Sequence, residues 1–440
     1  MSGAILGRRQ GKIHRLSGGE IQQEDWALPP PRKISRMIPL MLVLPMFAQI
    51  FHYMIDINSL YLLSKAWAVL MLPMAFYGVL GLRTRFALPY MLALLYGLGA
   101  TPVLSMMWLG NSISDAIVNS VKIWSLSYYF SLLGLLAWLQ PEPEVLVKAI
   151  NRLGIATIAV MWILWFTVPN RYYSGDPHVS RLFLAEYERG NRVYFPMTFA
   201  WLSMFYVLAR MLERPRLWHP IWIALVMATE ILLFKERMAL AASVLVMVGM
   251  VIFRLPPLWK SIAVAGGIAV GAIGAGLAVL KAEKLVSSLG GSLSIRQHSM
   301  QLLEAFLGDQ PLRWVFGAGA ASRVGSVNMA KIIGRADFFL ADLGWAGIIF
   351  EFGAFGALLL AMLYLVPLRW GWKQPPVADS ANRAMIGALV TYIAFLTICT
   401  AIYSPVYVPG ELASITAMLL YMNTMSQKDA QSPRETRRLM

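Results

Sequence analysis

A succession of apolar runs, each about as long as a transmembrane helix, is the feature that most limits how this chain can fold. A helix needs about 20 apolar residues to cross a bilayer. Soluble domains carry about a quarter of charged residues, whereas this chain carries 14% and is 58% hydrophobic. The sequence therefore predicts an all-α, polytopic integral membrane protein with about twelve transmembrane helices. The runs cover residues 37–55, 60–82, 86–108, 115–139, 153–169, 194–211, 218–234, 237–253, 260–281, 343–367, 384–404 and 411–425.

The two ends of the chain are polar and basic. Residues 1–36 include Arg8, and residues 426–440 include Arg437. Because basic residues are retained on the cytoplasmic side, we expect two cytoplasmic tails around a membrane domain of residues 37–425. An even number of spans agrees with this arrangement. The first apolar run follows a long polar segment, so we expect no signal peptide.

Two properties of the whole sequence, its cysteine content and its net charge, limit the possible functions. Cys399 is the only cysteine, which excludes an intrachain disulfide and a cysteine-rich metal site. The net charge is +15, but part of this charge is ordinary cytoplasmic anchoring. We therefore expect no nucleic-acid partner.

The loops between the runs divide by charge. Loops after even-numbered runs are basic, as cytoplasmic loops are; they hold Arg83, Arg85, Lys148, Arg152, Arg210, Arg214, Arg216, Arg254, Lys260, Arg369, Lys373 and Arg383. On the extracytoplasmic side, Asn58-Ser59, 110–114 and 404–410 contain no Lys or Arg. Three extracytoplasmic segments break the rule, and we treat them as parts of one site. They are 170–193, 235–237 and 282–342.

Arginine is concentrated in the two long extracytoplasmic loops. They hold Arg171, Arg181, Arg189 and Arg192, and then Arg296, Arg313, Arg323 and Arg335. A guanidinium can bind two phosphate oxygens at once, so this placement predicts a phosphate-containing ligand. Lys235 and Arg237 would join the group from the tight junction between two runs. The alternatives are a solvated charged loop at 170–193 and helix ends that reach to the membrane interface at 235–237.

The segment 282–342 contains an amphipathic pattern. Its apolar positions are Ile295, Leu302, Leu303, Phe306 and Leu307. They share one face of a short helix, which would lie on the membrane surface or cover a cavity. In the preceding run, glycines at close helical spacing predict intimate helix packing; they are Gly266, Gly267, Gly271, Gly274 and Gly276.

Short motifs in the second half of the chain resemble a known family. Arg296 opens the amphipathic helix, and a turn from Pro311 to Gly317-Ala318-Gly319 follows. A polar residue then precedes a span that carries Gly353-Ala354-Phe355-Gly356. Together with the junction Phe234-Lys235-Glu236-Arg237, this pattern is similar to the O-antigen polymerase and ligase superfamily. The resemblance covers about residues 170–365.

The resemblance implies a GT-C-like glycosyltransferase of the bacterial inner (plasma) membrane that uses no metal and no cofactor. Its substrate would be a polyprenyl-pyrophosphate-linked glycan at the outer leaflet. Membrane lipid, a flippase and a chain-length regulator would be its partners. Arg237 and Arg296 match the positions of phosphate-binding arginines in the family. Further candidates to bind the pyrophosphate are Arg181, Arg189, Arg192 and Lys235.

The ligase branch of the family has a His that leads into the span after the large loop. This chain has Asp337 and Asp342 there, with His178 and His298 elsewhere, which favours a Wzy-type exopolysaccharide polymerase. Asp342 is the first candidate for the catalytic base and His298 is the second. The alternatives are that Asp342 caps a helix and that His298 is an ordinary exposed residue.

Two other functions stay open. A ligase would move a finished glycan onto another lipid or a protein. A transporter or flippase of an anionic glycolipid would line its path with charges on several spans. The mid-span candidates for such a path are Lys65, Lys122, Glu230 and Glu351, which could instead pair locally or lie near an interface.

Overall fold

The computed structural model describes residues 37–55, 57–82, 84–176, 179–186, 189–280, 291–320, 340–374, 379–405 and 409–438. The predicted tail 1–36, the parts 282–290 and 321–339 of the segment 282–342 (with Arg323, Arg335 and Asp337), and His178 lie outside the described residues. The first half contains α1 (Met37–Phe47), α2 (Asn58–Leu70), α3 (Leu72–Phe76), η1 (Tyr77–Gly81), α4 (Ala87–Leu95), η2 (Tyr96–Ala100), α5 (Thr101–Leu109), α6 (Ile113–Trp124), η3 (Ser125–Ser127), α7 (Tyr128–Leu139), α8 (Pro143–Thr167), η4 (Asn170–Tyr172), β1 (Phe183–Glu186) and β2 (Gly190–Val193).

The second half is also mainly helical. It contains α9 (Thr198–Glu213), α10 (Trp218–Thr229), η5 (Glu230–Phe234), α11 (Arg237–Arg254), α12 (Pro257–Leu280), α14 (Gly291–Leu307), α15 (Pro311–Phe316), η6 (Leu340–Leu343), α17 (Gly344–Trp372), α18 (Ser380–Cys399) and α19 (Pro409–Arg438).

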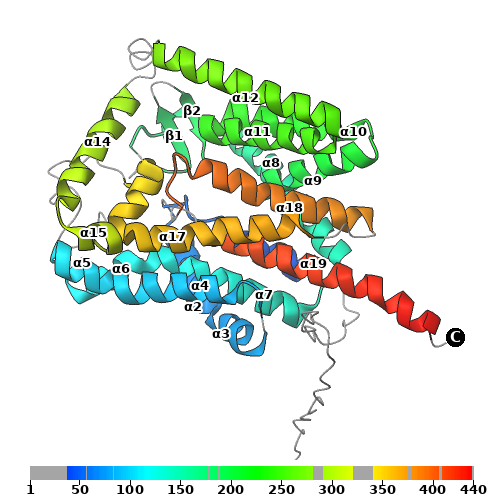
Figure 1. The fold of residues 1–440 in the computed structure, drawn as a ribbon, viewed down its shortest axis with the longest axis horizontal. Helices are drawn as coiled ribbons and strands as arrows, with labels where there is room; N and C mark the ends of the chain where they lie inside the picture. The colour runs from blue at the N-terminus through cyan, green and yellow to red at the C-terminus, as the bar shows by residue number, and fades with distance from the viewer. Residues whose placement is uncertain are drawn as a thin grey trace, which may run out of the picture.

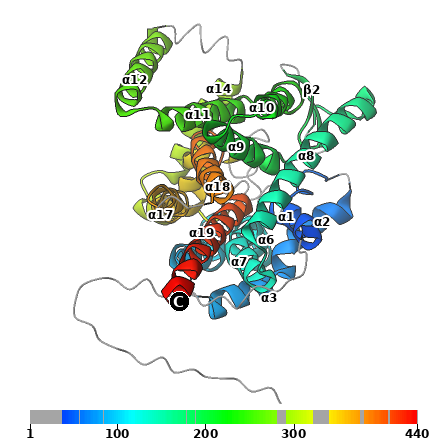
Figure 2. The same ribbon diagram turned by 90° about the vertical axis from the view of Figure 1, so that its right-hand side faces the viewer.

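The long helices are arranged in layers. α17, α18 and α19 lie between the N-terminal helices α2 to α7 and the group α8 to α12 (Figure 1). The view along the bundle shows α18 and α19 at its centre (Figure 2). Here α18 packs on α9, and α19 packs on α7. Buried aromatic side chains fill this region, among them Tyr128, Phe205, Tyr392, Phe395 and Tyr421.

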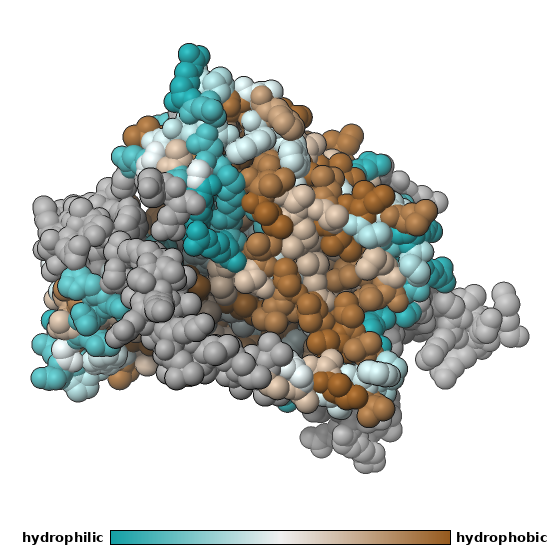
Figure 3. All heavy atoms as spheres, turned by 90° about the horizontal axis from the view of Figure 1, so that it is seen from above, coloured by the Kyte–Doolittle hydropathy of each residue, from teal (hydrophilic) through white to brown (hydrophobic). Residues whose placement is uncertain are grey.

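The surface of the bundle is apolar over a broad area. Figure 3 shows a band of hydrophobic side chains with hydrophilic residues at its edges. Exposed apolar residues of α10 to α12 include Ile221, Leu245, Phe253 and Ile262. Soluble monomers rarely expose large contiguous apolar patches, so this surface fits a lipid environment.

Six helices are long and apolar enough to cross a membrane. They are Asn58–Gly81, Ala87–Leu109, Pro143–Thr167, Arg237–Arg254, Gly344–Trp372 and Ser380–Cys399, and Met37–Phe47 and Trp218–Phe234 are shorter apolar helices. Each of the twelve apolar runs overlaps a helix or consecutive helices. These findings confirm a mostly helical protein with membrane-spanning helices, while the count of twelve spans stays a prediction.

The loops after even-numbered runs meet at one end of the bundle, which we call the basic end. There Glu213 Oε1 lies 3.6 Å from Arg254 Nη2 and 3.8 Å from Arg383 Nη1. Arg210 Nη1 donates a hydrogen bond to Ser380 Oγ at 2.6 Å. These contacts join the loops that follow the sixth, eighth and tenth runs.

The loops after odd-numbered runs meet at the opposite end, which carries β1, β2 and α14 (Figure 1) and which we call the loop end. Arg192 and Tyr403 both bond Glu236 there, and the Arg313 guanidinium lies 4.7 Å from the Trp108 ring. These contacts place the loops of Glu213, Arg254 and Arg383 at one end of the bundle and those of Arg192, Glu236 and Tyr403 at the other, while the side of a membrane that each end faces stays a prediction.

The loop 170–193 contains two short strands. It folds into η4 and an antiparallel hairpin in which Phe183 pairs with Val193 and Glu186 pairs with Gly190. The hairpin packs on α8 and η5. By contrast, α14 follows its predicted pattern: Leu303 and Leu307 are buried, and Leu302 and Phe306 pack against the same cluster.

Of the five glycines predicted to pack closely, the structure describes the surroundings of Gly266 and Gly267 only. A Cβ added at Gly266 or Gly267 would meet nothing within 4 Å, so these two residues of α12 do not make intimate contacts. A Cβ at Gly134 of α7 would clash with the Met74 carbonyl, and one at Gly78 would clash with the Phe130 carbonyl. Small residues therefore bring α7 close to α3 and η1.

α17 is interrupted at Gly353, which has a left-handed backbone with φ +64°. Carbonyl groups next to this break bond other segments. Ala318 N donates to Phe350 O at 2.7 Å, and Gly319 N donates to Glu351 O at 3.1 Å. The Tyr96 hydroxyl donates to Phe352 O at 3.0 Å. Irregular backbone is tolerated at membrane depth where the protein satisfies it in this way.

We predict that Gly353→Ala destabilises the protein. A left-handed backbone costs roughly 1–2 kcal/mol for a residue with a Cβ, and the added carbon would also clash with the Val315 carbonyl. Thermal unfolding of the purified protein in detergent measures the effect. Gly387→Ala in α18 is the matched control, because its Cβ would meet nothing within 4 Å. Equal melting temperatures for the two variants would contradict the left-handed break.

Candidate functional site

Two local backbone features bring charged residues together at the loop end. The hairpin of β1 and β2 directs Arg192 into the protein, where its side chain is only 8% exposed. At the junction between η5 and α11, Lys235 has a left-handed backbone with φ +57°. This bend lets the chain reverse direction while Lys235, Glu236 and Arg237 stay at the same end of the bundle.

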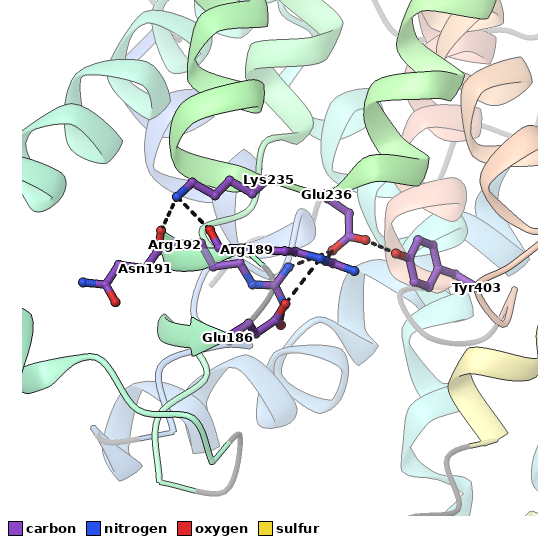
Figure 4. Close-up of polar contacts among 7 residues, drawn as sticks. All are labelled: Glu186, Arg189, Asn191, Arg192, Lys235, Glu236 and Tyr403. Atoms are coloured by element: carbon purple, nitrogen blue, oxygen red, sulfur yellow. Dashed lines mark hydrogen bonds and ion pairs between the residues drawn. The ribbon is translucent and has the colours of Figure 1, made fainter. Parts of the chain in front are cut away.

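Glu236 is the centre of the cluster (Figure 4). Its Oε2 atom accepts a hydrogen bond from Arg192 Nη1 at 3.1 Å and lies 3.5 Å from Arg189 Nη1. Its Oε1 atom accepts a hydrogen bond from the Tyr403 hydroxyl. Arg192 also bonds Glu186, whose second oxygen lies 3.3 Å from Arg189 Nε. Two guanidiniums thus face two carboxylates, and one of these carboxylates is buried.

Lys235 has a different role from its neighbours. Its Nζ donates hydrogen bonds to Arg189 O at 3.0 Å and to Asn191 O at 2.7 Å (Figure 4). The ammonium also lies 5.4 Å from the centre of the Trp165 ring. Burial lowers the pKa of Lys235, and the nearby Arg192 charge lowers it further. Lys235 therefore fixes the turn of the hairpin to the junction that precedes α11.

Aromatic rings continue the cluster toward α2. The Arg192 guanidinium lies 5.0 Å from the Tyr194 ring, and that ring stacks on Phe234 and meets Tyr53 edge-on. Next to Tyr53, His52 Nδ1 lies 3.2 Å from Lys65 Nζ. The charge of Arg181 acts on both His52 and Lys65. Pairwise contacts thus connect the Arg192 region, through Tyr194, to Phe234 and to Tyr53 next to His52.

Tyr403 approaches the cluster from the turn after α18. Burial raises its pKa, and the Glu236 carboxylate that it bonds raises it further. The charge of Asp342 acts in the same direction, so Asp342 lies near Tyr403. Asp342 is exposed in η6. The residue at the cap position of α17 is Leu343, and no side chain caps that helix, so Asp342 does not act as its N-cap.

The other site residues predicted from the sequence are more exposed than Arg192 and Glu236. Arg237 is exposed at the first position of α11. Arg296 is half-buried and His298 is exposed, both in α14. α14 and the start of α11 lie at the same end of the bundle (Figures 1 and 2). Contacts within the described residues join Arg189, Arg192 and Lys235 through the Glu236 region, and they do not join Arg296 or His298 to it.

The charges of this site favour an anion. The hairpin and the junction bring four cationic side chains together with two carboxylates, an excess of two positive charges; the cations are Arg189, Arg192, Lys235 and Arg237, and the carboxylates are Glu186 and Glu236. Asp342 adds a third carboxylate nearby, which leaves an excess of one positive charge. In the part of the chain that the structure describes, no group of three or more His, Cys, Asp or Glu could hold a metal ion.

Sequence reasoning did not identify Glu236, Tyr403 or Glu186 as site residues. Glu236 lies directly between Lys235 and Arg237, so its charge suggests a neighbour as partner. Its partners Arg192 and Arg189 instead come from 44 and 47 residues earlier in the chain. An acidic residue between two basic ones at the end of an apolar run is the one signal that points to such a buried carboxylate.

No model of a known protein family matches the chain, and no curated protein matches it.

We predict that Glu236→Gln strongly destabilises the protein. Removing one partner of a buried ion pair costs roughly 3–5 kcal/mol, and the buried Arg192 would keep only Glu186 as a carboxylate partner. The free energy of unfolding in denaturant, or the melting temperature in detergent, measures the effect. Glu144→Gln is the control, because Glu144 forms an exposed pair with Lys148 at 3.4 Å and such pairs contribute little. Equal stability of the two variants would exclude Glu236 as the charge that holds this end together.

Proposed function

We propose that this protein is a membrane glycosyltransferase that polymerises polyprenyl-pyrophosphate-linked oligosaccharide repeat units into a surface polysaccharide. The observation that carries the proposal is the gathering of Arg189, Arg192, Lys235 and Arg237 around one buried carboxylate at the loop end. The proposed reaction takes place at the outer face of the plasma membrane, across which about twelve spans run with both termini in the cytoplasm.

The cations of the cluster divide into two groups under this proposal. Arg192 and Lys235 are already held by protein oxygens, so they shape the site. Arg237 is exposed, and Arg189, which also pairs with Glu186 and Glu236, is 26% exposed at its side chain whereas Arg192 is buried. These two guanidiniums are the first candidates to bind the diphosphate. Arg181, beside Lys65, and Arg296, in α14, are candidates to bind its other side.

The chemistry needs charge neutralisation more than covalent catalysis. A hydroxyl of the acceptor sugar attacks the anomeric carbon of the donor, and the bond from that carbon to the pyrophosphate oxygen breaks. The leaving pyrophosphate takes the electron pair, and guanidiniums that face it lower the barrier. A base takes the hydroxyl proton. Asp342 is the candidate base because it is exposed and lies beside the cluster, with His298 of α14 as the second candidate.

The described loops support one composite site. The hairpin comes from the loop after the fifth run, and Glu236 from the loop after the seventh. Tyr403 comes from the turn after α18, at the end of the eleventh run, while α14 and η6 come from the loop after the ninth. Convergence of four loops at one end fits an enzyme that holds a lipid-linked donor at the membrane surface. A ligase would use the same lipid-linked donor, so only the acceptor molecule distinguishes a ligase from a polymerase.

A second candidate function is the transport of an anionic glycolipid, which the break in α17 favours. Transporters bind substrates at interrupted helices near the membrane midplane. Next to the break, Lys122 bonds both oxygens of Glu351, with 2.6 Å to Oε2. The other mid-span charges also have local partners: Lys65 bonds His52, and Glu230 accepts from Ser243. Local pairing favours a structural role for these charges over a charged path.

We predict that Arg237→Ala leaves membrane insertion intact and lowers chain extension by roughly 100-fold, the typical effect of losing one group that stabilises a leaving charge. Purified protein is incubated with a lipid-linked oligosaccharide and a chelator, and product length is measured. Lys373→Ala, which removes an exposed charge at the basic end, is the control and should extend chains normally. In cells, single units should accumulate on the outer leaflet; accumulation on the cytoplasmic leaflet would indicate a flippase instead.

A further inference from the structure

A groove opens at the basic end of the bundle, away from the site described above. Its volume is about 610 Å³, within the range of about 300–1,000 Å³ that is usual for ligand sites. It lies between α8, α9, α10 and the start of α18, and apolar side chains such as Val147, Ile155 and Val207 line it. The basic end is the end that the charge pattern predicts to be cytoplasmic.

Cations stand at the rim of this groove. Lys148 and Arg152 of α8 line it, and both are exposed. Lys148 has only a long, exposed contact with Glu144, at 3.4 Å, and Arg152 forms no ion pair with any carboxylate that the structure describes. The charges of Arg210 in α9 and Arg216 in the loop after it act on the His219 ring, while those of Glu213 and Asp379 act on Tyr206, which also lines the groove. With Glu144, three carboxylates therefore face four cations, and of the charged residues that line the groove itself, Lys148 and Arg152 face only Glu144.

Two indole rings complete the groove. Trp222 is fixed by a hydrogen bond from its Nε1 to Ser203 Oγ at 3.2 Å, and Trp218 is 49% exposed. Tryptophan is enriched where the hydrocarbon meets the lipid headgroups, because its ring is apolar and its N–H is polar. An apolar groove with indoles and a cationic rim matches a molecule with apolar chains and a negative head.

We propose that this groove binds one anionic diacyl phospholipid of the cytoplasmic leaflet, with the phosphate beside Lys148 and Arg152 and the acyl chains along Val147, Ile155 and Trp222. Basic pockets between transmembrane helices on the cytoplasmic side are a known arrangement for anionic headgroups. The charge of the rim selects against zwitterionic lipids, and the apolar lining selects against a free phosphate. This proposal is independent of the reaction at the loop end.

The test compares phosphatidylglycerol with phosphatidylcholine of identical chains. Binding of each lipid to the purified protein is measured by native mass spectrometry, and thermal stabilisation in detergent gives a second readout. The double variant Lys148→Ala/Arg152→Ala should bind phosphatidylglycerol about 10- to 30-fold more weakly, because each basic residue near a headgroup contributes about 1 kcal/mol. Its binding of phosphatidylcholine should not change.

The matched control is Lys260→Ala/Lys373→Ala, which removes the same charge at the basic end, from residues that do not line the groove. It should keep wild-type binding of phosphatidylglycerol. Three results would overturn the proposal: equal binding of the two lipids by the wild type, an equal loss in the control, or displacement of the lipid by inorganic phosphate. Displacement by inorganic phosphate would show that the groove binds small anions rather than a phospholipid.

Discussion

The Glu236 carboxylate connects three segments that are far apart in the sequence, and the geometry of the loop end depends on it. It meets the hairpin through Arg189 and Arg192, and the turn after α18 through Tyr403. An isolated buried carboxylate would be costly by several kcal/mol. Its partners offset that cost here, so the three segments are stable only when they are assembled together. Lys235 strengthens the same junction through backbone carbonyls.

This arrangement separates cations that build the site from cations that face outward. Arg189 and Arg192 pair with the same two carboxylates, but the Arg192 side chain is only 8% exposed and is not accessible to a further anion, whereas that of Arg189 is 26% exposed. Arg237 begins α11 next to Glu236 and is exposed, so the buried network determines where its backbone lies. The charge of Asp342, which comes from a different loop, also acts on Tyr403. The proposed donor site and proposed base are thus held by one polar network, which suits a reaction that depends on positioning and charge.

Much of the architecture could be predicted because it follows from local properties of the sequence. Apolar runs gave helices at the expected places, the basic loops gathered at one end, and α14 buried Leu303 and Leu307 as its pattern required. The hairpin at 183–193 was missed because four-residue strands in a charged loop carry no clear periodicity. In the sequence, Gly353 resembles a glycine that lets two helices pack closely. In the structure its backbone interrupts α17 and lies against Gly317 and its neighbours. The partners of Glu236 could not be predicted, since they depend on how distant loops meet.

The most direct test of the central claim is the affinity of the purified protein, in lipid nanodiscs, for undecaprenyl pyrophosphate compared with undecaprenyl monophosphate. Guanidiniums that converge on a diphosphate should bind the pyrophosphate form at least tenfold more tightly. Arg237→Ala and Arg189→Ala should each remove that preference while leaving binding of the monophosphate nearly unchanged. Equal affinity for the two lipids, or a preference that survives both substitutions, would contradict a diphosphate site at this end of the bundle.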